Sequence, residues 1–201
     1  MIISMEQIKK LREKTGVSIM QCRHALEEAK GDMDKAIVLL QKKGAEIASK
    51  KAERILKSSK IVSYIHALGG VGVLVELSSE SDFVSKHEDF QKLAYDMAMQ
   101  IAATNPEHIK KEDISSEEKN KVLKVLSSEV KDKPKSMQEK ILNGKLDVFF
   151  KDKILMEQNF IKDPSMTVKT LIDNAIQKFG EKIEITKFVR FGTNNQTTIC
   201  Q

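Results

Sequence analysis

The stretch that most constrains the fold lies at residues 60–78 and reads KIVSYIHALGGVGVLVELS. β-branched and aromatic residues alternate on each side of Gly69-Gly70, a pattern typical of two strands joined by a tight turn. Glycine suits such a turn because it takes positive φ without a steric penalty. The segment therefore predicts a β-hairpin, so the chain must form a sheet.

A second alternating segment, KIEITKFVRFG at residues 182–192, predicts one more strand. Alternation places four apolar residues on one of its faces: Ile183, Ile185, Val189 and Phe191. Together with the hairpin, this strand predicts a three-stranded antiparallel sheet packed with helices. The fold class that we expect is α+β.

The first 44 residues predict three helices, because apolar side chains recur there at helical spacing in three runs. Gly16 and Gly31 separate the runs, and Gly44 is expected to end the third. Ser18 with Gln21 forms a capping box at the start of the second run. We expect these helices to form a compact bundle.

Residues 45–58 are rich in Ala, Lys and Glu, which predicts a basic helical connector. Beyond the hairpin, Ser85 with Glu88 forms a capping box that predicts the start of another helix. Later helices are also expected, and one contains Gly144. Because an interior glycine costs a helix about 1 kcal/mol relative to alanine, Gly144 predicts a close packing contact.

The charge of the chain is unevenly distributed. Residues 1–60 carry 14 Lys+Arg and 8 Asp+Glu, a net of +6, whereas residues 61–201 carry 20 and 21, a net of −1. A basic segment on a neutral body favours an acidic partner, either protein or nucleic acid. A solvated lysine-rich surface would give the same count, so charge alone leaves both interpretations open.

The start of the sequence, MIISMEQIKK, is too short and too soon charged for a signal peptide. No apolar run in the sequence approaches the roughly 20 residues that span a bilayer. We therefore expect a cytoplasmic protein that makes no membrane contact.

The sequence contains no recognisable motif for enzyme chemistry. A GxxxxGK[ST] loop is absent, the four histidines have no metal-ligand spacing, and the two cysteines form no CxxC pair. Ser81, Asp82 and His87 lack the sequence context of a nucleophile set. We expect no enzyme activity, no cofactor and no bound metal.

The stretch SSESDFVSKH at residues 78–87 places Phe83 in the short gap between a predicted strand and the helix predicted from Ser85. Phe83 lies seven residues before Phe90, so a helix extended backwards would turn its ring to the core. An aromatic residue outside that helix would instead be available to another protein. The residues alone leave both interpretations open.

Four segments resemble the bacterial elongation factor Ts family in order and spacing, covering roughly residues 5–192. They are MEQIKKLREKTGVSIMQCRHALEEAKGDMDKAIVLLQKKG, YIHALGGVGVLVELSSESDFVSKHEDFQKLAYDMAMQIAATNP, MQEKILNGKLDVFFKD and KFVRFG. The resemblance is to short family members with a single core, which pair two chains, and it implies a homodimer.

The resemblance implies a division of the chain into four parts. Residues 1–44 would be a three-helix UBA-like module that docks on a GTPase, and residues 45–58 a connector. Residues 59–192 would form the α+β dimerisation core, and residues 193–201 a flexible C-terminal tail.

The function that the resemblance implies is guanine nucleotide exchange on elongation factor Tu, the GTPase that delivers aminoacyl-tRNA to the ribosome. In the family, a Thr-Asp-Phe-Val motif enters the GTPase beside its magnesium site and promotes GDP release by displacing Mg²⁺. Here the motif reads Ser81-Asp82-Phe83-Val84. Serine in place of threonine keeps the hydroxyl and loses one methyl group.

The resemblance also implies further partner-binding residues. His66 matches a histidine on the hairpin that reaches the GTPase, and Arg12, Ile19 and Met20 match positions of the N-terminal module that dock on it. Ile19 and Met20 could equally belong to the core of the bundle, although two adjacent positions can hardly both do so.

Two other functional classes stay open. A basic ribosome-binding or RNA-binding protein fits the charge of residues 1–60, but this segment contains no aromatic residue to stack on bases. We therefore expect no direct nucleic-acid contact. A general protein adaptor also stays open, because small three-helix modules bind many proteins.

Overall fold

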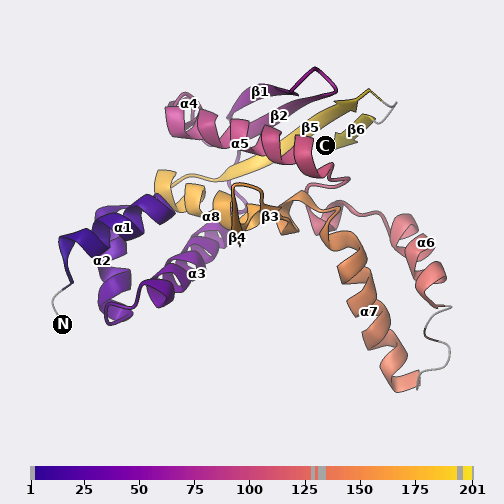
Figure 1. Ribbon diagram of the computed structural model, residues 1–201, viewed down its shortest axis with the longest axis horizontal. Helices are drawn as coiled ribbons and strands as arrows, with labels where there is room; N and C mark the ends of the chain where they lie inside the picture. The colour runs from indigo at the N-terminus through magenta and orange to yellow at the C-terminus, as the bar shows by residue number, and fades with distance from the viewer. Residues whose placement is uncertain (1–2, 128–129, 131–134, 194–196, 201) are drawn as a thin grey trace. The chain divides into compact units, whose positions relative to one another are not determined.

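The computed structural model describes residues 3–127, 130, 135–193 and 197–200 (Figure 1). The helices are α1 (Met5–Thr15), α2 (Ile19–Glu28), α3 (Met33–Lys51), α4 (Asp82–Ser85), α5 (Glu88–Thr104), α6 (Ser116–Ser127), α7 (Lys135–Lys151) and α8 (Val168–Phe179), with 3-10 turns η1 (Lys111–Asp113) and η3 (Leu155–Glu157). The strands are β1 (Ser58–His66), β2 (Val71–Ser79), β3 (Asn159–Phe160), β4 (Asp163–Thr167), β5 (Ile183–Gly192) and β6 (Thr197–Cys200). Helices combined with an antiparallel sheet confirm the α+β class.

The chain divides into two compact units, each built from separate stretches of sequence. Unit 1 comprises the described residues within 1–62, 76–95 and 169–186, and unit 2 those within 63–75, 96–168 and 187–201. Unit 1 contains α1 to α4 and α8, and unit 2 contains α6 and α7, which lie side by side (Figure 1).

The three predicted N-terminal helices are present and share a core in unit 1. Each begins at a side-chain cap. Ser4 accepts from the N–H of Gln7, Ser18 from that of Gln21, and Asp32 from those of Asp34 and Lys35. The buried residues that they enclose are Ile8, Leu11, Val17, Cys22, Ala25, Leu26, Ala29, Ala36 and Leu40.

The prediction that Gly44 ends the third helix is wrong, because α3 continues through Gly44 to Lys51. A Cβ built on Gly44 would lie 3.2 Å from Oε1 of Gln177 and 3.4 Å from the carbonyl oxygen of Asp173, both on α8. Glycine is used here for the close approach of two helices. The predicted basic connector therefore begins as part of α3, and β1 starts at Ser58.

Gly144, for which we predicted a close contact, has open space instead. It lies in the middle of α7, and an added Cβ would meet no described atom within 4 Å. The close approach that the sequence suggested at Gly144 occurs in this fold at Gly44.

The prediction of a three-stranded sheet is also wrong. The main sheet has four strands in the order β1-β2-β5-β6, and β3 and β4 form a separate two-stranded sheet. The added strand β6 comes from the segment that we predicted to be a flexible tail. It pairs antiparallel with β5, with Phe188 opposite Cys200 and Val189 opposite Ile199. Phe188 and Cys200 are both buried, so this pair packs β6 against β5.

The four apolar residues of β5 do not share one face, contrary to our prediction. Ile183 and Ile185 are buried, but farther along the strand the buried residues are Phe188 and Arg190. Phe191 is 54% exposed. The alternation thus slips by one residue within the strand, and such a slip exchanges the two faces.

Among the residues that the structure describes, no helix is long and apolar enough to cross a bilayer.

Candidate protein-docking site

The motif Ser81-Asp82-Phe83-Val84 forms a cap and a single helical turn in unit 1. Ser81 is the N-cap of α4, with extended backbone angles of φ −129° and ψ 158°, and its Oγ accepts from the N–H of Val84 at 3.5 Å. This short helix was not predicted, because its four residues are too few for a periodic pattern.

Ser85 does not begin the following helix, contrary to our prediction. It is the last residue of α4, is 5% exposed, and its Oγ bonds Oγ of Ser58 at 2.8 Å. The next helix, α5, starts at Glu88, and Nδ1 of His87 accepts from the N–H of Asp89 at 3.1 Å. A histidine thus takes the capping position that we had given to the serine.

Phe83 and Val84 lie in different environments. Phe83 is 77% exposed, whereas Val84 is 2% exposed and belongs to the core. The extended helix that would have turned Phe83 inward does not form, because α4 ends at Ser85. The ring of Phe83 is therefore not part of the core of its own unit and is accessible from solvent.

Asp82 is exposed beside Phe83 and forms an ion pair with Lys86. Nζ of Lys86 lies 2.7 Å from Oδ2 of Asp82. The hydrogen bond from this ammonium and its charge lower the pKa of the Asp82 carboxyl. The tip of the turn therefore presents an ionised carboxylate next to an aromatic ring at neutral pH.

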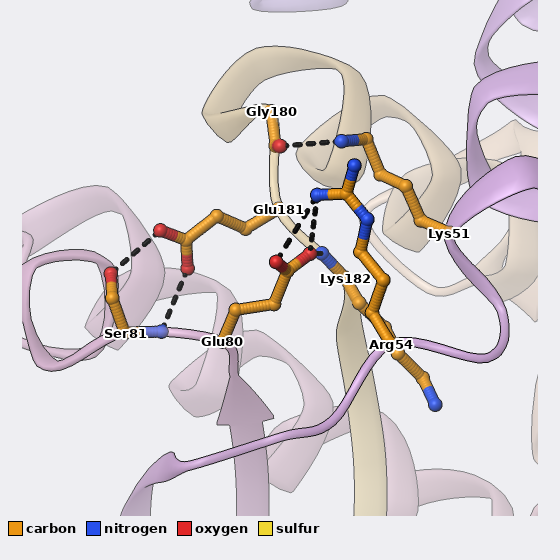
Figure 2. Close-up of polar contacts among 7 residues, drawn as sticks. All are labelled: Lys51, Arg54, Glu80, Ser81, Gly180, Glu181 and Lys182. Carbon is orange, nitrogen blue, oxygen red and sulfur yellow. Dashed lines mark hydrogen bonds and ion pairs between the residues drawn. The ribbon is translucent and has the colours of Figure 1, made fainter.

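The carboxylate of Glu181 holds the cap residue of this turn (Figure 2). It accepts from the backbone N–H of Ser81 at 2.9 Å and from the Ser81 hydroxyl at 2.6 Å. Glu181 comes directly after Gly180, whose φ of 71° lies in the left-handed region that favours glycine. That backbone angle brings the α8–β5 turn back towards the β2–α4 turn.

Glu80 makes the reciprocal contact. Its carboxylate accepts from the backbone N–H of Lys182 at 2.5 Å and from Arg54 at 3.2 and 3.3 Å (Figure 2). Partial burial opposes ionisation of Glu80, but the hydrogen bonds from Lys182 and Arg54 outweigh it and lower the pKa of the carboxyl. Residues 80–81 and 181–182 therefore bind each other side chain to backbone in both directions, an arrangement that we call the Ser81 clamp.

The end of α3 joins the same network. Nζ of Lys51, the last residue of α3, donates to the carbonyl oxygen of Gly180 at 2.7 Å. Arg54 follows three residues later and reaches Glu80. The basic connector that we predicted from composition thus supplies two cations to the clamp, a role that composition could not reveal.

The three predicted docking residues of the N-terminal bundle lie on its surface. Arg12 is exposed on α1, and Ile19 and Met20 at the start of α2 are 43% and 58% exposed. The core positions nearby are filled by Val17 and Cys22. Ile19 and Met20 are both exposed, so neither is buried in the core of the bundle.

His66 is exposed at the end of β1, in unit 2. Its Nδ1 lies 2.9 Å from the hydroxyl of Tyr64, and the two rings are tilted with centroids 6.0 Å apart. The side chain therefore does not pack in the core.

One cluster of possible metal ligands forms in unit 2, although the sequence showed no such spacing. Ligand atoms of Glu107, His108 and Glu118 lie within 4.8 Å of one another. However, Glu107 is paired with Lys153 at 2.7 Å, and Nε2 of His108 is 3.1 Å from Glu118. These contacts account for the cluster, so we assign no ion to it.

Glu80 and Glu181 of the clamp were missed by the sequence analysis, as was Arg54, which bonds Glu80. Glu80 and Glu181 are 101 positions apart, and no local pattern marks them as neighbours. The one available signal was Gly180, which ends a helix and so predicts a turn at which the next side chain changes direction.

Comparison with known proteins gives a consistent result. The sequence matches the family described as "Elongation factor TS" over residues 5–195. It is 47% identical over 191 residues to the elongation factor Ts of Thermotoga maritima, which covers 95% of this chain and 96% of that protein. It is also 47% identical over 192 residues to that of Thermodesulfovibrio yellowstonii, covering 95% and 96%, and 46% identical over 192 residues to that of Carboxydothermus hydrogenoformans, covering 94% and 88%.

Proposed function

Because this chain belongs to the elongation factor Ts family, we propose that it is a guanine nucleotide exchange factor for elongation factor Tu. It would bind the GTPase in its GDP-bound state, promote GDP release and stabilise the nucleotide-free state during translation elongation. The protein itself would hydrolyse nothing and need no cofactor.

The observation that carries the proposal is the exposed ring of Phe83 on a turn held by buried and charged contacts. We propose that Ser81, Asp82, Phe83 and Val84 act at the magnesium site of the GTPase. Phe83 would insert between the elements that hold Mg²⁺ and the β-phosphate, and so displace the ion. Val84 would support the turn from within its own core rather than touch the partner.

Energetics require more contacts than Phe83 alone. A thousandfold acceleration of GDP release corresponds to about 4 kcal/mol of differential stabilisation. Burying one phenylalanine side chain contributes roughly 1.5–3 kcal/mol. The remainder must come from a broader surface that prefers the nucleotide-free GTPase. By linkage, nucleotide binding then expels the factor as strongly as the factor expels nucleotide.

We propose that the UBA-like bundle at residues 1–44 supplies part of that surface. Arg12, Ile19 and Met20 are exposed on two adjacent helices, as docking residues must be. His66, exposed on the β1–β2 hairpin, would provide a separate contact from the core.

We also propose that two chains form a homodimer through the outer face of the main sheet. This face carries exposed apolar side chains, at a position where a sheet usually presents polar ones. Those in unit 2 are Ile65, Leu74, Phe191 and Ile199, with exposures of 69%, 47%, 54% and 62%.

A stopped-flow measurement of labelled-GDP release from elongation factor Tu tests the proposal. The purified chain should accelerate release at least a hundredfold at saturation, an effect of about 2.7 kcal/mol on the barrier. An excess of RNA serves as a competitor, because an RNA-binding protein would be titrated away. A release rate that does not change with added chain would refute the exchange function.

A further inference from the structure

We infer that Glu181 is the positioning residue for Phe83, an inference that rests on the proposed exchange function. Glu181 is not part of the motif and is not expected to touch the GTPase. Its carboxylate fixes the backbone of Ser81, and Ser81 in turn sets the direction in which Phe83 leaves the protein.

All polar groups of Ser81 are occupied in unit 1. The N–H and the hydroxyl both donate to Glu181, at 2.9 and 2.6 Å. The carbonyl oxygen accepts from the hydroxyl of Ser79 at 2.8 Å and from the N–H of Ser85 at 3.3 Å. Because the hydroxyl hydrogen goes to Glu181, the oxygen keeps a lone pair for the N–H of Val84.

The direction of Phe83 depends on this backbone anchoring. Its ring is 77% exposed, so packing within its own chain restrains it little. The C-terminal end of the turn is held by the buried side chains of Val84 and Ser85. The N-terminal end is held at Ser81 by Glu181. Removing Glu181 would therefore remove two of the bonds that hold the N-terminal end of the turn and leave the C-terminal end in place.

Glu181 is itself well placed for this task. The adjacent Lys182 N–H is bound by Glu80, and the preceding carbonyl of Gly180 is bound by Lys51. Both neighbours of Glu181 are thus fixed, so its carboxylate is presented to Ser81 with little freedom (Figure 2). Pre-organisation of this kind reduces the ordering that a binding loop must undergo in a complex.

A residue that positions the inserting ring should affect the rate of exchange more than the binding of the GTPase. The remaining docking surface is unchanged in Glu181→Ala, so the concentration for half-saturation should stay within about twofold. The maximal rate of GDP release should fall about tenfold, because two hydrogen bonds to a charged acceptor are lost. Glu181→Gln should stay within about threefold of wild type, because the amide can accept from the Ser81 N–H and donate to its hydroxyl.

The decisive experiment is a double-mutant cycle with the full-length chain. GDP release from elongation factor Tu is measured for wild type, Glu181→Ala, Phe83→Ala and the double variant. Because Glu181 acts through Phe83, its loss should have no further effect once Phe83 is absent. Glu53→Ala, which removes an exposed carboxylate from the same unit, is the matched control and should behave as wild type.

Amide hydrogen exchange on the free chain gives a readout that needs no partner. In Glu181→Ala the amides of residues 82–86 should exchange at least about tenfold faster, while those of the α1–α3 core keep their rates. Ser81→Ala removes both bonds of the hydroxyl, to Glu181 and from the Val84 N–H, but keeps the bond from the Ser81 N–H to Glu181, so it should give a smaller effect in the same place. It also replaces Glu181→Ala in the cycle if that variant does not fold.

The outcomes separate the inference from the proposed function. A wild-type chain that does not accelerate GDP release overturns both. An active wild type with an unchanged maximal rate in Glu181→Ala overturns the inference alone. The same holds if Glu181→Ala slows release equally with and without Phe83, or if the turn amides keep their exchange rates. The inference is supported if Glu181→Ala lowers the maximal rate of GDP release in the wild-type background but has no effect on it in the Phe83→Ala background.

Discussion

Phe83 and Val84 are adjacent in one helical turn, yet the first is 77% exposed and the second 2% exposed. The turn therefore separates two roles in neighbouring side chains. Val84 attaches the turn to the protein, and Phe83 is the residue that we propose contacts the partner. This division makes the two residues a natural pair for mutagenesis.

Phe83→Ala should slow factor-catalysed GDP release tenfold or more without loss of stability. The ring buries little surface in the free chain, so the free energy of unfolding should change by less than about 0.5 kcal/mol. Stopped-flow GDP release and urea denaturation measure the two quantities.

Val84→Ala is the control for that variant, because it should lower the free energy of unfolding by about 1–3 kcal/mol through loss of a buried side chain. A rate of GDP release that is unchanged in Phe83→Ala would show that the ring does not enter the GTPase.

Met20→Glu should weaken binding to elongation factor Tu about tenfold and leave the melting temperature of the chain unchanged. Met20 is 58% exposed at the start of α2, so a charge there meets solvent in the free chain. In the proposed complex the same charge would have to be desolvated. Calorimetric titration of nucleotide-free elongation factor Tu measures the change, with Val38→Glu on α3 as an exposed control of similar chemistry. Equal affinities for both variants and wild type would contradict the docking role of Met20.

Gly44→Ala and Gly144→Ala should have opposite effects on stability. Both glycines lie inside helices, where alanine is intrinsically better by about 1 kcal/mol. At Gly144 the space is open, so the substitution should stabilise by roughly that amount. At Gly44 the added methyl group would press on Gln177 and on the backbone of Asp173, which should cancel the gain and destabilise by about 1 kcal/mol. Urea denaturation of the two variants measures their free energies of unfolding. A higher value for Gly44→Ala than for wild type would show that α3 and α8 can move apart without cost.

Phe191→Glu should convert the proposed dimer to a monomer. Phe191 lies on the outer face of β5, on the same side as Val189 and its partner Ile199. A carboxylate there would be buried without a partner in a sheet-to-sheet interface, at a cost of several kcal/mol. Sedimentation velocity over a range of concentrations gives the oligomeric state. A wild-type chain that sediments as a monomer would rule out the interface, whatever the variant does.

Cys200 should make the chain less stable as the pH rises into the alkaline range. Burial, together with the carboxylates of Asp113 and Glu107, raises the pKa of the Cys200 thiol to about 11. Since the folded pKa is higher than the ordinary value of 9.0, the folded state binds its proton more tightly than the unfolded chain. The stabilisation is therefore complete below pH 9 and is lost as the pH rises from 9 to about 11.

Urea denaturation of wild type and Cys200→Ala at pH 8, 9 and 10 measures this dependence. The wild-type free energy of unfolding should fall more steeply with pH than that of the variant. Two parallel curves would mean that Cys200 ionises with its ordinary pKa.

The elements of the fold that sequence patterns predicted are those with long, regular repeats. The N-terminal helices, the β1–β2 hairpin and β5 each contain enough periodic residues to be recognised. Strand β6 was missed because it contains only four residues and because it pairs with β5, a partner that no local pattern reveals. The slip in the alternation of β5 was missed for a related reason, since a single irregular position leaves both halves of the pattern intact.

The candidate site divides in the same way. Its exposed members, such as Phe83, stand out in sequence because a large aromatic residue follows an acid between two predicted elements. Its supporting members do not, because Glu80 and Glu181 look like any other surface carboxylates. They become recognisable only when the fold brings two distant turns together.

The Ser81 clamp has a practical consequence. The clamp and the contacts that Lys51 and Arg54 make with it use no atom of Asp82 or Phe83. These two positions can therefore be randomised while the anchoring contacts persist. A library built at this tip would offer a route to recombinant binders for chosen protein targets.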